Sequence, residues 1–305
     1  MTGSVAANPR RGVIAGLLAY SMWGVFPVYF KLVDAVAPLE VLAHRIVWAV
    51  PFGLVIILAR RQTAELRQAF RSPGTLAWLA LAALSIAGNW FVYIWAVVNE
   101  RIFETSLGYY VNPLVYVLVG VLFFGERLRR LQQAAAVLAA VGVLILTISG
   151  GALPWVSLSL AGLFTAYGVI RKRVSIGAMP GLFLETLMLV PFAGGWLIYI
   201  VAADAASFGS GDASLTGLLL LAGPITVLPL LFFATAARNV TLTTLGFMQF
   251  IAPTLQFMTG VWYGETLTPA HLACFGFIWL AVLAFSLDAV TTNRKKPPAV
   301  TPPGA

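Results

Sequence analysis

Ten long apolar runs follow one another along this chain, and they limit its fold more than any other feature of the sequence. A helix needs about 20 mostly apolar residues to cross a bilayer, where it must satisfy its own backbone hydrogen bonds. The chain is 60% hydrophobic and 10% charged, whereas a soluble domain carries about 25% charged residues. We expect an all-α membrane protein with ten transmembrane helices, at residues 12–32, 38–59, 74–98, 103–124, 132–149, 155–170, 180–202, 214–235, 243–262 and 269–289.

The first apolar run follows the basic segment MTGSVAANPRR, as the core of a secretory signal would. A signal peptide, however, has an apolar core of about 7–15 residues and a cleavage site of small residues. The run at 12–32 is longer and lacks a clear site of that kind. We therefore expect it to remain in the protein as the first span.

Positive charge alternates with the spans. Sixteen of the 19 Lys and Arg residues lie before span 1 or after an even-numbered span. Cytoplasmic loops of membrane proteins are enriched in these residues, so both termini are predicted to be cytoplasmic. The formal charge of +8 is not gathered into a groove-binding patch, which argues against nucleic acid as a partner and leaves membrane lipid and a small-molecule substrate.

The two halves of the chain resemble each other at an offset of 138–140 residues. This offset corresponds to five helices. Because five is an odd number, the second half would be inverted in the membrane. This is the architecture of many secondary transporters, whose substrates bind near the midplane between the halves. The matching landmarks are Thr105–Gly108 with Thr243–Gly246, Pro113 with Pro253, Gly125-Glu126 with Gly264-Glu265, and Pro51-Phe52 with Pro191-Phe192.

These landmarks predict four segments. They are a cytoplasmic N-terminus at 1–11, a first five-helix repeat at 12–149, a second, inverted repeat at 155–289, and a basic, Pro-rich tail at 290–305 that is expected to be disordered. Paired prolines inside spans indicate kinks that belong to the repeated fold. Glu126 and Glu265 each follow a glycine at a helix end, and we expect them to cap the helix that comes next.

Several kinds of chemistry lack the residues that they need. Cys274 is the only cysteine, and His44 and His271 are the only histidines, so the sequence predicts no disulfide and no metal site. It contains no HExxH, GxSxG or GxxxxGK[ST] motif. We therefore expect no enzymatic activity, no cofactor and no direct coupling to ATP.

Two charged residues lie inside predicted spans. A charged side chain there is costly and normally faces protein or water, beside a partner. Arg45 either lines the permeation pathway or extends outward to Asp34, Glu40 or carbonyl groups. Glu185 is either a protonatable coupling site or a cap near the basic cluster at 171–173. The inverted topology places Arg45 and Glu185 at different depths, so we expect no contact between them.

Aromatic and polar side chains share faces on three helices of the first half. A cavity lined in this way would suit an amphipathic organic solute. The alternatives are aromatic residues of the interfacial belt and asparagines that join helices by hydrogen bonds. The candidate lining consists of Tyr20, Trp23, Arg45, Asn89, Trp90, Tyr93, Tyr109, Tyr110 and Asn112, with Gln249 from the second half.

One long segment carries a family resemblance. The stretch GNWFVYIWAVVNERIFETSLGYYVNPL, followed by GERLRRLQQ, resembles the RarD family, also called chloramphenicol-sensitive proteins. That family belongs to the EamA-type branch of the drug/metabolite transporter superfamily, which has ten helices in two repeats. The resemblance extends from span 1 to span 10. It implies a multi-pass exporter or permease of the bacterial inner membrane, and it implies no agreed substrate.

Three classes of function follow. The repeat and the scarcity of intramembrane charges favour a secondary transporter of small organic metabolites or drugs, working by alternating access, with proton coupling as one option. A membrane sensor or non-transporting subunit is the alternative. A membrane-embedded enzyme fits least, because no catalytic constellation is present. Substrate, direction, coupling ion and oligomeric state are not encoded in any motif that we find.

Overall fold

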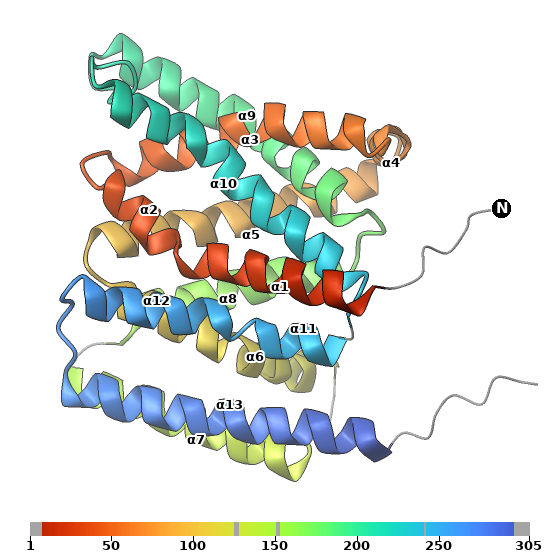
Figure 1. Ribbon diagram of the computed structural model, residues 1–305, viewed down its shortest axis with the longest axis vertical. Helices are drawn as coiled ribbons and strands as arrows, with labels where there is room; N and C mark the ends of the chain where they lie inside the picture. Colours follow the sequence, from red (N-terminus) through yellow and green to blue (C-terminus); the bar gives the residue numbers. More distant parts are fainter. Residues whose placement is uncertain (1–7, 125–127, 151–152, 241, 296–305) are drawn as a thin grey trace, which may run out of the picture. The chain divides into compact units, whose positions relative to one another are not determined.

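The computed structural model describes residues 8–124, 128–150, 153–240 and 242–295. Within these ranges all regular secondary structure is α-helical. Figure 1 shows the helices, which are α1 (Pro9–Gly24), α2 (Phe26–Leu32), α3 (Pro38–Ala59), α4 (Thr63–Phe70), α5 (Pro73–Val98), α6 (Ile102–Phe124), α7 (Arg130–Gly150), α8 (Trp155–Arg171), α9 (Ala178–Ala202), α10 (Ala213–Ala237), α11 (Leu242–Met248), α12 (Ile251–Trp262) and α13 (Pro269–Lys295).

Seven stretches of the described chain are long and apolar enough to cross a membrane. They are Pro9–Leu32, Pro38–Ala59, Pro73–Val98, Arg130–Ser149, Ala178–Ala202, Ala213–Ala237 and Pro269–Asp288. The other three expected spans fall on α6, on α8 and on the pair α11 and α12. Helix α8 is apolar and, with 17 residues, shorter than these stretches. The all-helical membrane class is thus confirmed, at seven candidate spans.

Two expected spans are broken into shorter helices. The first is interrupted at Val25, where α1 ends and α2 begins, and the ninth is interrupted at residues 249–250, between α11 and α12. Pro27 and Pro253 lie in the first turn of the helix after each break. A proline costs little there, because the first amides of a helix have no intrahelical partner. The sequence predicted one continuous helix in each place.

Other prolines lie within helices, as expected. Pro51 is inside α3, Pro113 inside α6 and Pro191 inside α9. Helix α10 contains two more, Pro224 and Pro229. Each removes one backbone hydrogen bond from its helix.

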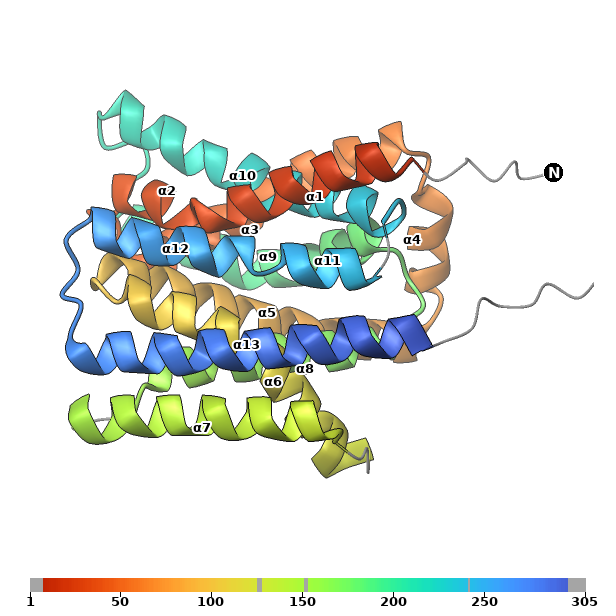
Figure 2. The ribbon, with the colours of Figure 1, turned by 60° about the horizontal axis from the view of Figure 1, so that its bottom comes forward.

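The described chain divides into two compact units. Unit 1 contains Met1–Asn112 and Trp155–Thr266, and unit 2 contains Pro113–Pro154 and Leu267–Ala305, so the division falls inside α6. In unit 2, α7 packs along α13 (Figure 2), and Arg129 forms an ion pair of 3.0 Å with Asp288. Helix α13 continues to Lys295, past residue 289 where the last span was expected to end. The rest of the predicted tail, residues 296–305, lies outside the described residues.

Unit 1 is organised around α3. This helix packs against α9 and α10, while α5 packs against α8 and α1 against α10 (Figure 1). The largest apolar core joins α2, α3, α5, α8, α9 and α10, and Phe30, Ile94 and Leu160 are fully buried in it. In lipid, such close packing replaces the hydrophobic effect as the force that holds helices together.

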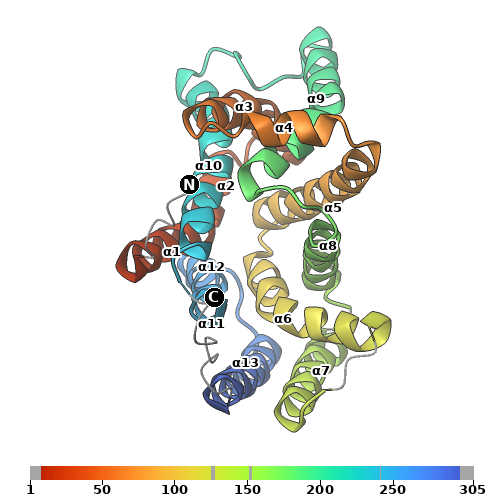
Figure 3. The same cartoon turned by 90° about the vertical axis from the view of Figure 1, so that its right-hand side faces the viewer.

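The two ends of unit 1 differ in charge. Arg10, Arg11 and Arg60 line one pocket at the end where α1 begins and α3 ends. The short helix α4 follows α3 at this end (Figure 3), and the Gly177 amide, just before α9, donates to Glu65 of α4 over 3.0 Å. The other end carries Glu40, Glu265 and a 3.9 Å ion pair between Lys31 and Glu100.

Helices α3 and α10 meet at backbone contact through Gly223. A Cβ at Gly223 would collide with the carbonyl group of Trp48 and lie 2.8 Å from the Trp48 Cβ. Glycine allows this approach, as small residues do at other membrane helix interfaces. The contact matters for function because α3 and α10 carry Arg45 and Thr226.

We predict that Gly223→Ala lowers stability by about 1–3 kcal/mol, the usual cost of overpacking. The measurement is thermal unfolding in detergent. Gly217→Ala on the same helix is the matched control, since a Cβ there meets nothing within 4 Å. Equal stability of the two variants would contradict the close contact.

Candidate functional site

Arg45 is buried in the middle of unit 1 with a neutral partner. Its side chain is 5% exposed, and its Nε donates to Thr226 Oγ1 of α10 over 2.8 Å. The Thr226 hydroxyl in turn donates to the Ala222 carbonyl oxygen over 2.8 Å, so its oxygen is oriented to accept. Arg45 forms no ion pair with Asp34 or Glu40, two of the partners considered for an outward-extending side chain.

Aromatic rings surround the guanidinium. Its carbon lies 4.2 Å from the centroid of Trp90, 5.4 Å from that of Phe26 and 5.8 Å from that of Phe30. Such cation–π contacts contribute about 0.5–2 kcal/mol each and only partly replace water. In the described part of the chain no carboxylate lies within ion-pair distance of Arg45. We call Arg45, Phe26, Phe30, Trp90 and Thr226 the Arg45 cluster.

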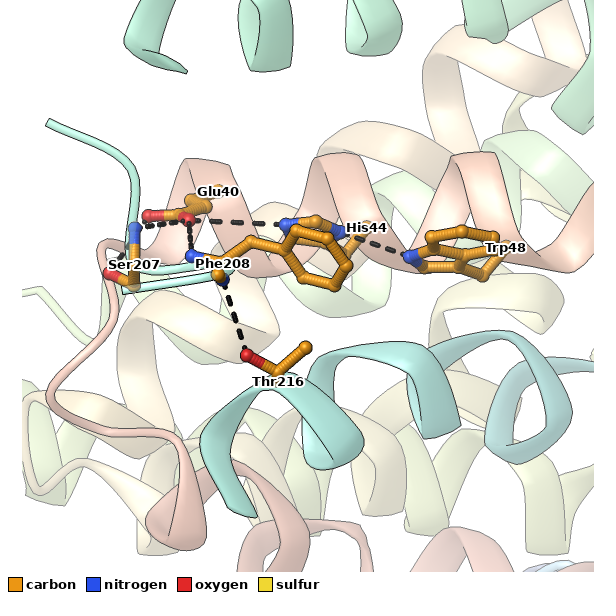
Figure 4. A network of polar contacts seen from close by, with 7 residues as sticks. Glu40, His44, Trp48, Ser207, Phe208 and Thr216 are labelled. Atoms are coloured by element: carbon orange, nitrogen blue, oxygen red, sulfur yellow. Dashed lines mark hydrogen bonds and ion pairs between the residues drawn. The ribbon is translucent and has the colours of Figure 1, made fainter. Parts of the chain in front are cut away.

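Glu40 is satisfied by a loop instead (Figure 4). Its Oε1 accepts from the amides of Ser207 and Phe208 over 2.7 and 3.1 Å, and its Oε2 accepts from the Ser207 hydroxyl over 3.0 Å. These bonds fasten the connection between α9 and α10 to the start of α3. A carboxylate with three such donors is already stabilised, and it is not needed as the counter-ion of Arg45.

His44 belongs to the same network. Trp48 Nε1 donates to His44 Nδ1 over 3.1 Å, which places the proton of the neutral ring on Nε2. That Nε2 lies 3.9 Å from Glu40 Oε1, and the ring packs on Phe208 at 4.8 Å (Figure 4). Sequence reasoning found no second histidine near His44, and its observed partners give it a structural role.

Asn89, Tyr93 and Tyr109 come together beside the Arg45 cluster. Asn89 is buried, donates to the Leu160 carbonyl oxygen over 3.0 Å and accepts from the Tyr109 hydroxyl over 3.1 Å. The rings of Tyr93 and Tyr109 lie 5.8 Å apart, and Tyr93 lies 5.8 Å from Phe30. Asn89 therefore joins α5, α6 and α8, which is the joining role that the sequence left open.

The hydroxyl of Tyr93 is buried without a hydrogen bond to any described residue. The Thr105 hydroxyl lies beside it and donates to the Ile102 carbonyl oxygen over 2.8 Å. A buried polar atom without a partner is costly, and it marks a position where a bound molecule or water could be held.

Tyr110 and Asn112 contact other helices. The Tyr110 hydroxyl lies 2.6 Å from that of Thr254 in α12, and its ring stacks on Phe250. Asn112 accepts a hydrogen bond of 3.2 Å from Thr165 in α8. Both are buried at helix interfaces of unit 1.

Tyr20, Trp23 and Gln249 make other contacts. Tyr20 and Trp23 pack edge-on at 5.4 Å and both touch Phe233 of α10. Trp23 packs against this group and also against the core that contains Phe26 and Phe30. Gln249 is half-buried at the break between α11 and α12, with no side-chain hydrogen bond to another described residue.

Glu185 forms a separate buried site. It is fully buried, accepts from the Tyr167 hydroxyl over 3.2 Å and pairs with Arg171 Nε at 3.5 Å. Arg171 also reaches the carbonyl of Gly177, and a Cβ on Gly181 would collide with its guanidinium. The partner of Glu185 thus comes from the basic cluster at 171–173, and Glu185 and Arg45 have different partners.

Glu265 caps a helix other than the expected one. Its Oε2 accepts from the Phe103 amide at the start of α6 over 3.1 Å. The next helix, α13, is capped by Thr268, whose hydroxyl accepts from the His271 amide over 3.3 Å. Glu265 therefore ties α12 to α6 within unit 1, and the prediction that it caps the following helix was wrong. Glu126 lies outside the described residues.

Burial raises the pKa of Glu265 to about 7, although the amides of Phe103 and Ile102 favour its charged form. A carboxyl group whose pKa is higher in the folded state stabilises the fold below its unfolded pKa, and this contribution is lost as pH rises through the folded value.

We predict that Glu265→Gln removes this dependence. The Tm of the wild type minus that of Glu265→Gln should fall between about pH 4.5 and pH 7.5. Thermal unfolding across this range measures it. A rising difference would show that the charged carboxylate is the preferred cap, and a constant difference would show that folding does not shift the pKa of Glu265.

Four hydroxyl groups were missed by sequence reasoning. They are Thr226, Thr254, Thr165 and Tyr167, and each pairs with a polar residue of another helix. A threonine within an apolar helix was the available signal, but it usually bonds to its own backbone. In the described residues no group of three or more His, Cys, Asp and Glu side chains could hold a metal ion.

Comparison with known proteins shows which family this chain resembles. Residues 10–148 match the EamA-like transporter family. Protein RarD of Salmonella typhi is 42% identical over 95% of this chain and 99% of its own length, and the uncharacterized transporter YojE of Bacillus subtilis is 42% identical over 94% and 97%. The chloramphenicol-sensitive protein RarD of Pseudomonas aeruginosa is 34% identical over 94% and 97%.

A solved crystal structure shares the fold. It aligns with a TM-score of 0.58 and 20% identity, over 93% of this chain and 99% of that one. At this identity the likeness concerns the fold alone. The family match and the near full-length relatives go further, and they show that this chain is a membrane transporter that belongs to the RarD family of EamA-like proteins.

Proposed function

We propose that this protein is a secondary-active transporter that moves small organic metabolites or drugs by alternating access between two inverted five-helix repeats. The observation that carries the proposal is the buried guanidinium of Arg45, which lies against Trp90 and has no carboxylate partner among the described residues. A charge held in this way inside a bundle of apolar helices is costly, and such charges commonly mark a solute pathway.

The packing of unit 1 supports the inverted repeat. At the sequence offset, α1 corresponds to α8, α3 to α9, and α5 to α10. The contact of α5 with α8 then has its counterpart in that of α10 with α1, and the contact of α3 with α10 in that of α9 with α5. Helix α3 also packs against its own counterpart α9. Two related halves would produce this set of pairs.

The charge distribution supports the orientation. Arg10, Arg11 and Arg60 share one end of unit 1, while Glu40 and Glu265 lie at the other. By the positive-inside rule the arginine-rich end faces the cytoplasm. The protein would then lie in the bacterial inner membrane with both termini cytoplasmic.

The Arg45 cluster would act as the anchor for the solute. Arginine offers several donors in one plane, suited to a carboxylate or another anionic group. The rings of Trp90, Tyr93 and Phe30 would receive an apolar or aromatic part of the same molecule. This combination favours an amphipathic solute over an inorganic ion.

We predict that Arg45→Gln reduces solute flux at least tenfold, a change of about 1.4 kcal/mol or more in binding of the transported state. The measurement is flux into liposomes that contain purified protein, with solutes first identified by a metabolite screen of a knockout strain. Arg67→Gln, an exposed change on α4, is the control. Wild-type flux in Arg45→Gln would remove Arg45 from the pathway.

Proton coupling would use Glu185. The Glu185 carboxylate is held by Tyr167 and Arg171, so its protonation would release the ion pair and loosen α8 from α9.

We predict that Glu185→Gln abolishes uptake driven by a pH gradient but preserves exchange of labelled for unlabelled solute. A loss of both activities in a stably folded variant would indicate a structural role.

A sensor or non-transporting subunit is the second candidate. It would bind the same solutes through Arg45 without moving them. Binding to purified protein without flux in liposomes would favour it over the transporter.

A further inference from the structure

A pocket of about 440 Å³ opens between the start of α1 and the last turns of α10. Arg10, Arg11 and Arg60 line its polar side, and Ile14, Leu18 and Leu231 line its apolar side. All of these residues belong to unit 1. The pocket is separate from the Arg45 cluster and shares no residue with it.

The charges at this pocket are unbalanced. Burial lowers the pKa of Arg60, and the nearby positive charges of Arg238 and Arg11 lower it further. Within the described part of the chain, no carboxylate lies within ion-pair distance of any of these four arginines. Like charges repel one another, so a bound anion would relieve this crowding.

Local hydrogen bonds fix the backbone at the start of α1. The Asn8 side chain accepts from the Arg11 amide over 3.1 Å and caps α1. The Asn8 amide donates to the Asn239 side chain over 3.0 Å, which ties the start of α1 to the residue just after α10. A Cβ on Gly12 would lie 2.6 Å from that of Asn239, so the two segments are in close contact. The pocket is therefore built into the helix packing.

The apolar side of the pocket continues onto the membrane-facing surface. Ile14 is 49% exposed and Leu18 44% exposed, and both lie on the candidate span Pro9–Leu32. The arginines thus lie at one end of the pocket, and the exposed apolar residues at its other end would contact lipid chains. Basic pockets between membrane helices on the cytoplasmic side are suited to acidic lipid headgroups.

We propose that this pocket binds the headgroup phosphate of an anionic phospholipid from the cytoplasmic leaflet. The phosphate would contact Arg11 and Arg60, and an acyl chain would lie along Ile14 and Leu18. The site would bridge the ends of α1, α3 and α10, which come from both halves of the sequence repeat. It goes beyond the proposed function and depends on the orientation of the helices, whether or not the chain transports a solute.

Thermal unfolding of the full-length protein in a neutral detergent tests the proposal. Added phosphatidylglycerol should raise the Tm, and phosphatidylcholine should not. The double variant with Arg11→Gln and Arg60→Gln should lose this increase. The control with Arg67→Gln and Arg71→Gln loses the same charge from exposed positions outside the pocket and should keep it.

A second variant covers the case in which the double pocket variant does not fold. Ile14→Glu introduces a carboxylate into the pocket near the arginines. Because Ile14 is exposed, the protein should remain folded while it loses the response to phosphatidylglycerol. Three results would each overturn the proposal. They are an equal response of pocket and control variants, an equal effect of phosphatidylcholine, and an effect of inorganic phosphate alone that matches the lipid.

Discussion

The packing at the centre of unit 1 depends on one buried guanidinium, that of Arg45. Arg45 lies inside a candidate span, so its charge must be stabilised by groups that the surrounding helices bring to it. Thr226 supplies an oriented oxygen from α10, and Trp90 supplies a ring from α5. The close approach of α10 to α3 at Gly223 places Thr226 within reach. The nearby carboxylate, Glu40, is bound to a loop and does not pair with Arg45.

The polar groups of unit 1 serve two purposes that composition alone does not separate. Asn89, Asn112 and Tyr110 are paired with groups on other helices, so they specify how those helices fit together. The Tyr93 hydroxyl has no hydrogen-bond partner among the described residues, and Arg45 makes one side-chain hydrogen bond, to Thr226. In a membrane interior, where each unpaired polar group is costly, this difference is the best guide to where a solute would bind.

The helical membrane class and the family were predictable, because span length and hydropathy follow directly from bilayer thickness. The breaks at Val25 and at residues 249–250 were not, since Pro27 and Pro253 are compatible with either a kink or a new helix. The pairing of Glu185 with Arg171 was partly predictable, because the sequence placed Glu185 near the basic cluster at 171–173. The cap from Glu265 to α6 could not, because Phe103 is 162 residues away in the sequence and only the tertiary fold brings them together.

We propose that the charge of Arg45, which has no carboxylate partner among the described residues, anchors the transported solute. A structure of the protein with a transported solute bound would test this proposal. We expect solute density within hydrogen-bonding distance of the Arg45 guanidinium, with its apolar part against Trp90 or Tyr93. Density confined to another part of the protein, with Arg45 still bonded only to Thr226, would contradict it.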